Sequence, residues 1–159
     1  MRKRIYFDRW RQYGWPAVSE IKPYFIAQKG REWFYAGGND SAGIYIEGID
    51  GTEHLDHFTG RKDVSLQMWG NPEHGVFVMY QRGVGPFDIT NAYCSKGDMS
   101  RLGELVYSLH DTPLPVGLYI PFAKAWLAVK EFMETEGQLP KSIEWVRNTD
   151  LPPNTFPDP

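Results

Sequence analysis

The sequence has little cysteine and no long apolar run, and both shortages restrict what the chain can be. Cys94 is the only cysteine among the 159 residues, which excludes an internal disulfide framework and predicts a reducing, cytoplasmic location. No segment approaches the roughly 18 consecutive apolar residues of a membrane-spanning helix. The basic start, residues 1–12, is not followed by an apolar stretch, so we expect no secretory signal there.

The chain also lacks an excess of positive charge. The net charge of −3 argues against general nucleic-acid binding, because such domains usually carry a basic patch and a high pI. Apolar residues (42%) and aromatic residues (15%) are plentiful, which indicates a folded chain with a sheet-rich core. The length predicts one domain over residues 1–149. Residues 150–159 are rich in proline and predict an extended, largely unpacked tail.

The clearest local pattern lies between residues 121 and 136, where apolar residues recur at helical spacing. Pro121 suits the first helical turn, where its missing N–H costs nothing. Gly137 can adopt the left-handed conformation that ends a helix, and Pro140 stops any continuation. The pattern therefore predicts an amphipathic helix packed on the core. Its apolar face consists of Phe122, Ala125, Trp126, Val129, Phe132 and Met133.

Upstream of this helix, short segments of alternating or apolar residues predict strands. These segments are residues 32–36, 43–47, 63–69, 76–80 and, more weakly, 87–93. Residues 1–30 are rich in aromatics and predict one or two strands or a short helix.

Apolar residues return to helical spacing over residues 98–109, where Asp98 or Ser100 could cap a second helix. Residues 116–120 and 143–146 predict two further strands. The expected fold class is α+β: an antiparallel sheet of about five to seven strands with two helices packed on one face.

One segment, Glu-His-Leu-Asp-His at residues 53–57, resembles a metal site. His54 and His57 are three apart, so a helical turn could bring both imidazoles together with Asp56 or Glu53 nearby. A catalytic zinc site normally needs a third protein ligand on a fixed scaffold, and the sequence identifies none. A polar loop between two strands is therefore the favoured interpretation.

Other signs of catalysis are weak. The glycine-rich segments 37–41 and 82–86 lack the residues that complete a phosphate loop or a dinucleotide fingerprint, and hairpin turns explain both. Cys94 has only Lys96 as a nearby cation and no neighbouring histidine, so we expect a buried strand cysteine rather than a nucleophile. The sequence thus predicts no enzyme, with no catalytic residue, metal site or cofactor.

Negative charge is concentrated in one part of the chain. Between Glu32 and Gly60 the sequence has six carboxylates and no lysine or arginine. Solvated turns and an outer strand face explain such a run. The functional alternative is a surface that meets a basic partner, since complementary charge raises association rates and biases partner choice.

The C-terminal third of the chain resembles the immunity protein 1 family of bacterial polymorphic toxin systems. Members of that family end in a Pro-led helix with small and apolar residues every three or four positions, then a Phe, a Gly-Xaa-Xaa-Pro turn and a strand that closes on Trp. The matching residues here are Pro121, Ala125, Val129, Phe132, Gly137, Pro140, Ile143 and Trp145. The resemblance extends over residues 31–147 and is most specific over 116–146. Residues 98–109 and the tail depart from the family pattern, which leaves the class of partner open.

The resemblance implies a cytoplasmic α+β protein that neutralises a co-encoded toxin, often a nucleic-acid deaminase, by occluding its active site. A toxin that handles nucleic acid should present a basic cleft, which an acidic surface would suit. We therefore expect a basic toxin partner, with no direct binding of nucleic acid or membrane. The candidate contact residues are Asp40, Glu47, Asp50, Glu53 and Asp56, with Trp33, Tyr45 and Phe58 as aromatic anchors.

Two other functions stay open on the sequence. One is a non-catalytic domain that binds a small ligand or regulates another protein, with aromatics lining a cavity between sheet and helix. The other, less favoured, is a metal-dependent hydrolase that uses His54 and His57.

Overall fold

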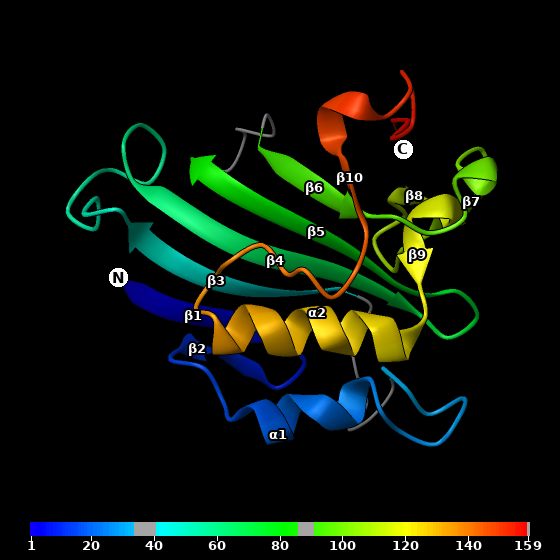
Figure 1. The fold of residues 1–159 in the computed structure, drawn as a ribbon, viewed down its shortest axis with the longest axis horizontal. Helices are drawn as coiled ribbons and strands as arrows, with labels where there is room; N and C mark the ends of the chain where they lie inside the picture. The colour runs from blue at the N-terminus through cyan, green and yellow to red at the C-terminus, as the bar shows by residue number, and fades with distance from the viewer. Residues whose placement is uncertain (34–40, 86–90, 159) are drawn as a thin grey trace.

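The fold is built on a large antiparallel sheet, which the computed structural model describes together with its surroundings for residues 1–33, 41–85 and 91–158 (Figure 1). Within these residues eight strands pair in the order β10-β6-β5-β4-β3-β1-β2, and the short β9 pairs with β5. The strands are β1 Arg2–Phe7, β2 Trp10–Tyr13, β3 Ser41–Ile49, β4 Lys62–Asn71, β5 Gly75–Val84, β6 Ala92–Ser95, β9 Tyr119–Ile120 and β10 Trp145–Arg147.

The central strands have one apolar and one polar face, as alternation along a strand dictates. Ile44 of β3 lies opposite Leu66 of β4, and both side chains are fully buried in the core. Their chain neighbours Tyr45 and Ser65 also lie opposite each other, on the other face of the sheet. We call the polar side the open face, because the long helix covers only the apolar side.

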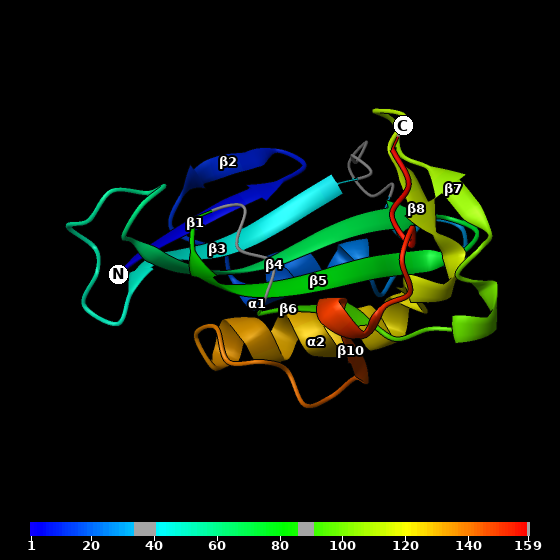
Figure 2. The ribbon, with the colours of Figure 1, turned by 90° about the horizontal axis from the view of Figure 1, so that it is seen from above.

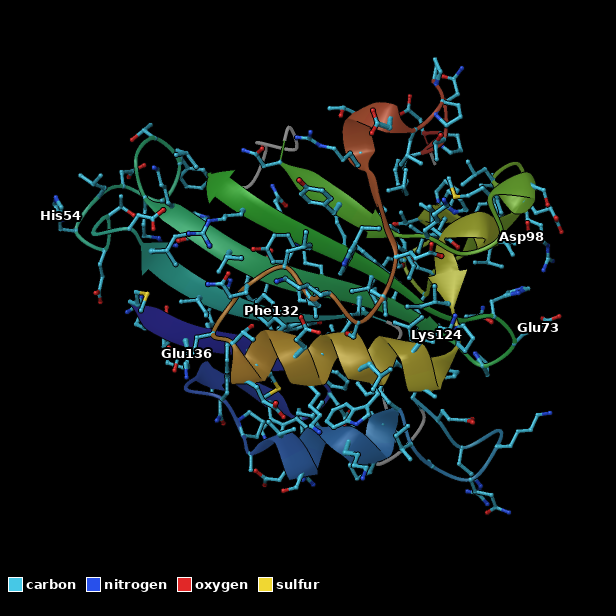
Figure 3. All side chains as sticks on the ribbon, in the orientation of Figure 1. His54, Glu73, Asp98, Lys124, Phe132 and Glu136 are labelled. Atoms are coloured by element: carbon cyan, nitrogen blue, oxygen red, sulfur yellow. The ribbon has the colours of Figure 1, made fainter. Side chains whose placement is uncertain are left out.

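Helix α2, Phe122–Glu134, covers the apolar face (Figures 1 and 2). Phe132 points from this helix toward the sheet (Figure 3), and its ring lies 6.2 Å from the ring of Tyr80. Just past its end, Glu136 and Gly137 both have positive φ, and the Gly137 N–H donates to the carbonyl of Phe132 at 2.9 Å. These contacts form a Schellman-type stop.

An aromatic cluster closes the N-terminal end of the core. The short helix α1, Val18–Ile21, and the 3₁₀ turn η1, Lys22–Tyr24, bring it against the sheet. The Phe7 ring lies 4.7 Å from Tyr24 and 5.2 Å from Trp33. Trp33 rests on Gly70, where an added Cβ would sit 2.2 Å from the indole, so a residue with a side chain cannot occupy that position without displacing the ring.

A second apolar cluster lies on the open face, near the start of β5. It contains Phe77, Cys94, Leu114, Leu118 and Tyr119. The hairpin of β7, Leu105–Tyr107, and β8, Pro113–Pro115, adjoins it, as does the 3₁₀ turn η4, Val116–Leu118.

The C-terminal segment packs on this second cluster instead of remaining free. After the 3₁₀ turn η5, Asn148–Asp150, Leu151 contacts the cluster, and the Phe156 ring stacks on Phe77 at 6.0 Å. Two apolar side chains of the segment expected to form a largely unpacked tail thus contact this cluster, because they gain burial there.

The α+β class is confirmed, but the main sheet has more strands than the five to seven expected. The helix expected over residues 98–109 is wrong. Asp98 caps only the 3₁₀ turn η3, Met99–Arg101, by accepting from the Ser100 N–H at 3.1 Å. Gly103 follows, and the next residues pair as β7 with β8, so strand pairing overrides helical spacing.

The expected strands at residues 43–47, 63–69 and 76–80 lie within β3, β4 and β5, apart from minor differences at their ends. The expected strands at 32–36 and 87–93 fall largely outside the described residues. Among the helices that the structure describes, none has the length and apolarity needed to cross a membrane.

Candidate interaction surface

Residues 50–61, which we call the β3–β4 loop, extend beyond the sheet; in Figure 3 the labelled His54 lies at the tip. Internal hydrogen bonds hold the loop in place. The Thr52 hydroxyl donates to the Ile49 carbonyl at 2.7 Å and accepts from the Lys62 N–H at 2.8 Å. Asp56 Oδ1 accepts from the Phe58 N–H at 2.9 Å. The loop therefore presents its side chains in a defined arrangement.

The loop combines exposed apolar groups with exposed carboxylates. Phe58 is 64% exposed and Leu55 is 41% exposed. Asp50, Glu53 and Asp56 are exposed on the same loop. An aromatic side chain beside charged groups is a common arrangement at protein interfaces.

Local hydrogen bonds favour the charged form of two of these carboxylates. The Phe58 N–H lowers the pKa of Asp56, and the N-terminal ammonium group lowers the pKa of Glu53 through a hydrogen bond and its charge. Glu53 pairs with that ammonium group, and Asp50 lies 3.3 Å from Arg82. Asp56 forms no ion pair with any residue that the structure describes.

The structure places the other predicted contact residues differently. Trp33 is 2% exposed and belongs to the aromatic cluster of the core, so its indole is not available to a partner. Glu47 is 5% exposed. Tyr45 is half-buried on the open face, where burial raises its pKa and the Arg4 guanidinium lies 4.1 Å from its ring centroid. Asp40 lies outside the described residues.

Glu47 is neutralised by arginines distant in sequence. Its carboxylate lies 2.6 Å from Arg4, 3.0 Å from Arg61 and 3.4 Å from Arg2. Arg61 also pairs with Asp63 at 2.9 Å. Three arginines thus surround two carboxylates, so Glu47 presents no unpaired negative charge. Among the described candidate carboxylates, the exposed ones are Asp50, Glu53 and Asp56 of the β3–β4 loop.

Between this loop and the open face lies a shallow polar hollow of about 330 Å³. Its lining includes Tyr45, Ser65 and Gln67 of the sheet and His57 of the loop. These groups can donate and accept hydrogen bonds, but they include no nucleophile paired with a base. The hollow suits recognition of a polar side chain rather than chemistry.

The described part of the fold does not bring together a set of side chains that could bind a metal ion. In the described ranges, no three His, Cys, Asp or Glu side chains gather closely enough to hold a metal ion. His57 Nδ1 lies 2.9 Å from an Arg61 nitrogen and 3.4 Å from Asp63, and we take the shorter contact as the hydrogen bond, with Nδ1 as acceptor. That contact occupies the lone pair of Nδ1. Cys94 is buried, and burial raises the pKa of its thiol to about 12, so it is not a poised nucleophile.

The expected cavity between sheet and helix is filled by side chains. Phe25 and Trp126 lie 5.8 Å apart there, and Phe132 and Tyr80 lie 6.2 Å apart. An open hollow of about 540 Å³ lies farther along the sheet, where Tyr80 and Tyr93 meet Gln138 and Leu139.

Sequence reasoning missed one charged surface, on strands β1 and β2. Positive and aromatic side chains lie together there. The sequence pattern that could have predicted this surface is the alternation of residues 2–7, which places Ile5 and Phe7 in the core and the arginines on the outside. The overall charge of −3 concealed it.

Comparison with known proteins gave a match to a family model. The family model described as Immunity protein Imm1 matches residues 6–147, nearly the whole chain. Neither the curated proteins nor the solved structures gave a match. The family match runs from the end of β1 to β10 and includes α2. The chain therefore belongs to the Imm1 family of immunity proteins.

Proposed function

We propose that this chain acts in the bacterial cytoplasm as a non-catalytic inhibitor, which binds a cognate toxin of a polymorphic toxin system and occludes its active site. Membership of an immunity family supports a toxin partner in general. Charge complementarity with the β3–β4 loop supports a basic toxin that acts on nucleic acid. That this toxin is a deaminase is what the family resemblance implies.

One observation carries the proposal: an ordered loop projects an exposed ring beside exposed carboxylates. Phe58 is the most exposed phenylalanine of the described chain, and Asp56 lies two residues away with its charge unpaired. A basic cleft that normally holds phosphate would attract these carboxylates, and an apolar ring can then bury area that anchors the complex.

The set of contact residues in this proposal is smaller than the set predicted from the sequence. Asp50, Glu53, Asp56 and Phe58 belong to the loop, and Tyr45 lies in the adjoining hollow. Asp40 stays a prediction. Glu47 and Trp33 support the fold beneath the surface.

The first test is co-expression with the product of the adjacent gene. We expect a stable complex on purification and rescue of growth when this chain accompanies the toxin. Failure of both would reject the immunity role.

The second test locates the surface. We expect the triple variant Asp50→Asn, Glu53→Gln, Asp56→Asn to associate with the toxin about 10-fold more slowly at low salt, with the difference shrinking at high salt. The matched control removes three exposed carboxylates remote from the loop: Asp111→Asn, Glu144→Gln, Asp150→Asn. Equal association rates for the two triple variants would reject the loop as the binding surface.

A further inference from the structure

The hairpin of β1 and β2 carries the densest positive charge of the chain. Residues 1–15 include five basic side chains and a single carboxylate, Asp8. Asp8 is already engaged, because it accepts a hydrogen bond from the Tyr24 hydroxyl. The hairpin therefore has a strongly basic character within a protein whose net charge is −3.

Alternation along the strands places three of these basic groups, Arg2, Arg4 and Arg11, on the open face. Ile5 and Phe7 point into the core, so Arg4 and Tyr6 point the opposite way. The register places Tyr13 of β2 opposite Arg4 and Arg11 opposite Tyr6. We call this surface the arginine–tyrosine face; it consists of Arg2, Arg4, Tyr6, Arg11 and Tyr13.

On this face each guanidinium group is stacked on a ring. Arg2 lies 3.9 Å from the centroid of Tyr13, and Arg11 lies 4.9 Å from that of Tyr6. Stacking uses the flat side of the guanidinium and leaves its N–H edge free to bind a carboxylate with two hydrogen bonds. The arginines are thus held in place before any partner arrives, which lowers the entropy lost on binding.

The N–H groups of Arg11 are also available. Within the described residues Arg11 has no ion pair, and Arg2, whose side chain is 50% exposed, has a single ion pair at 3.4 Å to Glu47. Tyr13 is 56% exposed. A hollow of about 250 Å³ opens between Arg4, Arg11 and Tyr13. The face can therefore receive an acidic side chain without breaking the fold.

We propose that the arginine–tyrosine face binds an acidic protein segment of the toxin, with Arg11 and Arg2 as carboxylate receptors. This inference rests on the proposed function and adds a second contact of opposite sign beside the β3–β4 loop. The two surfaces are adjacent, since the N-terminal ammonium group at the start of β1 pairs with Glu53 of the loop. Adjacent contacts of opposite charge fix the orientation of a partner and disfavour wrong ones.

A protein carboxylate suits this face better than a nucleic acid does. Nucleic-acid platforms expose aromatic faces on which bases stack, whereas here guanidinium groups cover Tyr6, Tyr13 and Tyr45. A phosphate backbone that followed the strands would also run into the carboxylates of the β3–β4 loop. A discrete acidic segment avoids them.

The test measures binding of the purified toxin to Arg11→Glu and to a matched control, Arg31→Glu, which makes the same charge change at an exposed residue outside the face. We expect Arg11→Glu to weaken binding at least about 10-fold, and Arg31→Glu to change it less than about 2-fold. Arg11→Gln, which removes the charge without reversing it, should give an intermediate loss. A thermal unfolding midpoint equal to that of wild type verifies that each variant is folded.

The outcomes separate the two proposals. If Arg11→Glu binds like Arg31→Glu while the loop triple variant associates slowly, the second contact is overturned and the proposed function stands. If the wild-type chain forms no complex with the toxin, both are overturned. A single-stranded 20-mer oligonucleotide that binds wild type but not Arg11→Glu would overturn the acidic-protein assignment in favour of nucleic acid.

Discussion

Successive residues of strands β3 to β5 point to opposite faces of the sheet, and the two faces have different surroundings. Ile44 and Leu66 are buried beneath α2, whereas Tyr45 and Gln67, one residue further along their strands, lie in a polar hollow on the open face. Because side chains alternate, variants at adjacent positions should report on different properties. We expect substitutions on the helix side to change stability and, in our proposal, substitutions on the open side to change binding of the toxin.

The largest effect should come from the helix side. We expect Phe132→Ala to lower the free energy of unfolding by about 3–5 kcal/mol, because the residue is completely buried and its removal leaves a cavity. Leu127→Ala on the same helix is the control, since that side chain is 48% exposed and should cost much less. Urea unfolding followed by circular dichroism measures both, and equal losses would contradict the assignment of the α2 face.

Glu47 is the exception to the comparison, because it lies on the open face yet supports the fold. We expect Glu47→Gln to cost about 1–3 kcal/mol, since it leaves a poorly solvated site with unmatched arginines. The control is Glu134→Gln, which removes a half-exposed i,i+4 partner of Lys130 and should cost less than about 0.5 kcal/mol. Chemical denaturation distinguishes them. If the Glu47 variant were as stable as wild type, Glu47 would not be a residue that supports the fold.

Phe58 should behave in the opposite way to Phe132. We expect Phe58→Ser to change the free energy of unfolding by less than about 0.5 kcal/mol, because the ring is mostly exposed. Its affinity for the toxin should fall about 10-fold or more, since anchoring aromatics dominate interfaces. Titration calorimetry measures the affinity, with Leu127→Ser as an exposed apolar control on the helix side. Comparable affinities for the two variants would argue that the ring is not an anchor.

The smallest effect concerns Cys94. Its thiol is buried and its pKa is raised to about 12, so at pH 8 almost none of it is thiolate in the folded chain. In the unfolded chain the ordinary pKa of about 8.5 applies, and the thiol becomes reactive. We expect no labelling by iodoacetamide in native buffer and full labelling in denaturant. Rapid native labelling would show that the second apolar cluster opens.

Local sequence patterns predicted the parts of the fold whose conformation depends mainly on residues close together in the chain. The apolar spacing of α2 gave its buried face, and Lys130 and Glu134 pair at 3.8 Å as their separation suggests. The helix stop was shifted by one residue: the left-handed turn begins at Glu136, with Gly137 as the second residue of positive φ. The helix expected at residues 98–109 failed because β7 finds its partner in β8, several residues away, which spacing alone does not reveal.

The candidate site was predictable only in part, because charges from distant segments meet there. The run without lysine or arginine correctly located the exposed carboxylates of the β3–β4 loop. It could not show that Arg4 lies 2.6 Å from Glu47, since 43 residues separate them and strand register brings them together. Trp33 was misplaced for a similar reason: its burial depends on contact with β4 at Gly70.

Strand β2 forms the last strand of the main sheet in the part of the chain that the structure describes. A free edge of this kind offers backbone N–H and C=O groups to any other extended chain, including a second copy of the same protein. Arg11 on this strand, and Arg9 just before it, would set like charges against each other in such a pairing. We therefore expect neutralisation of both arginines to make the protein more prone to edge-to-edge self-association.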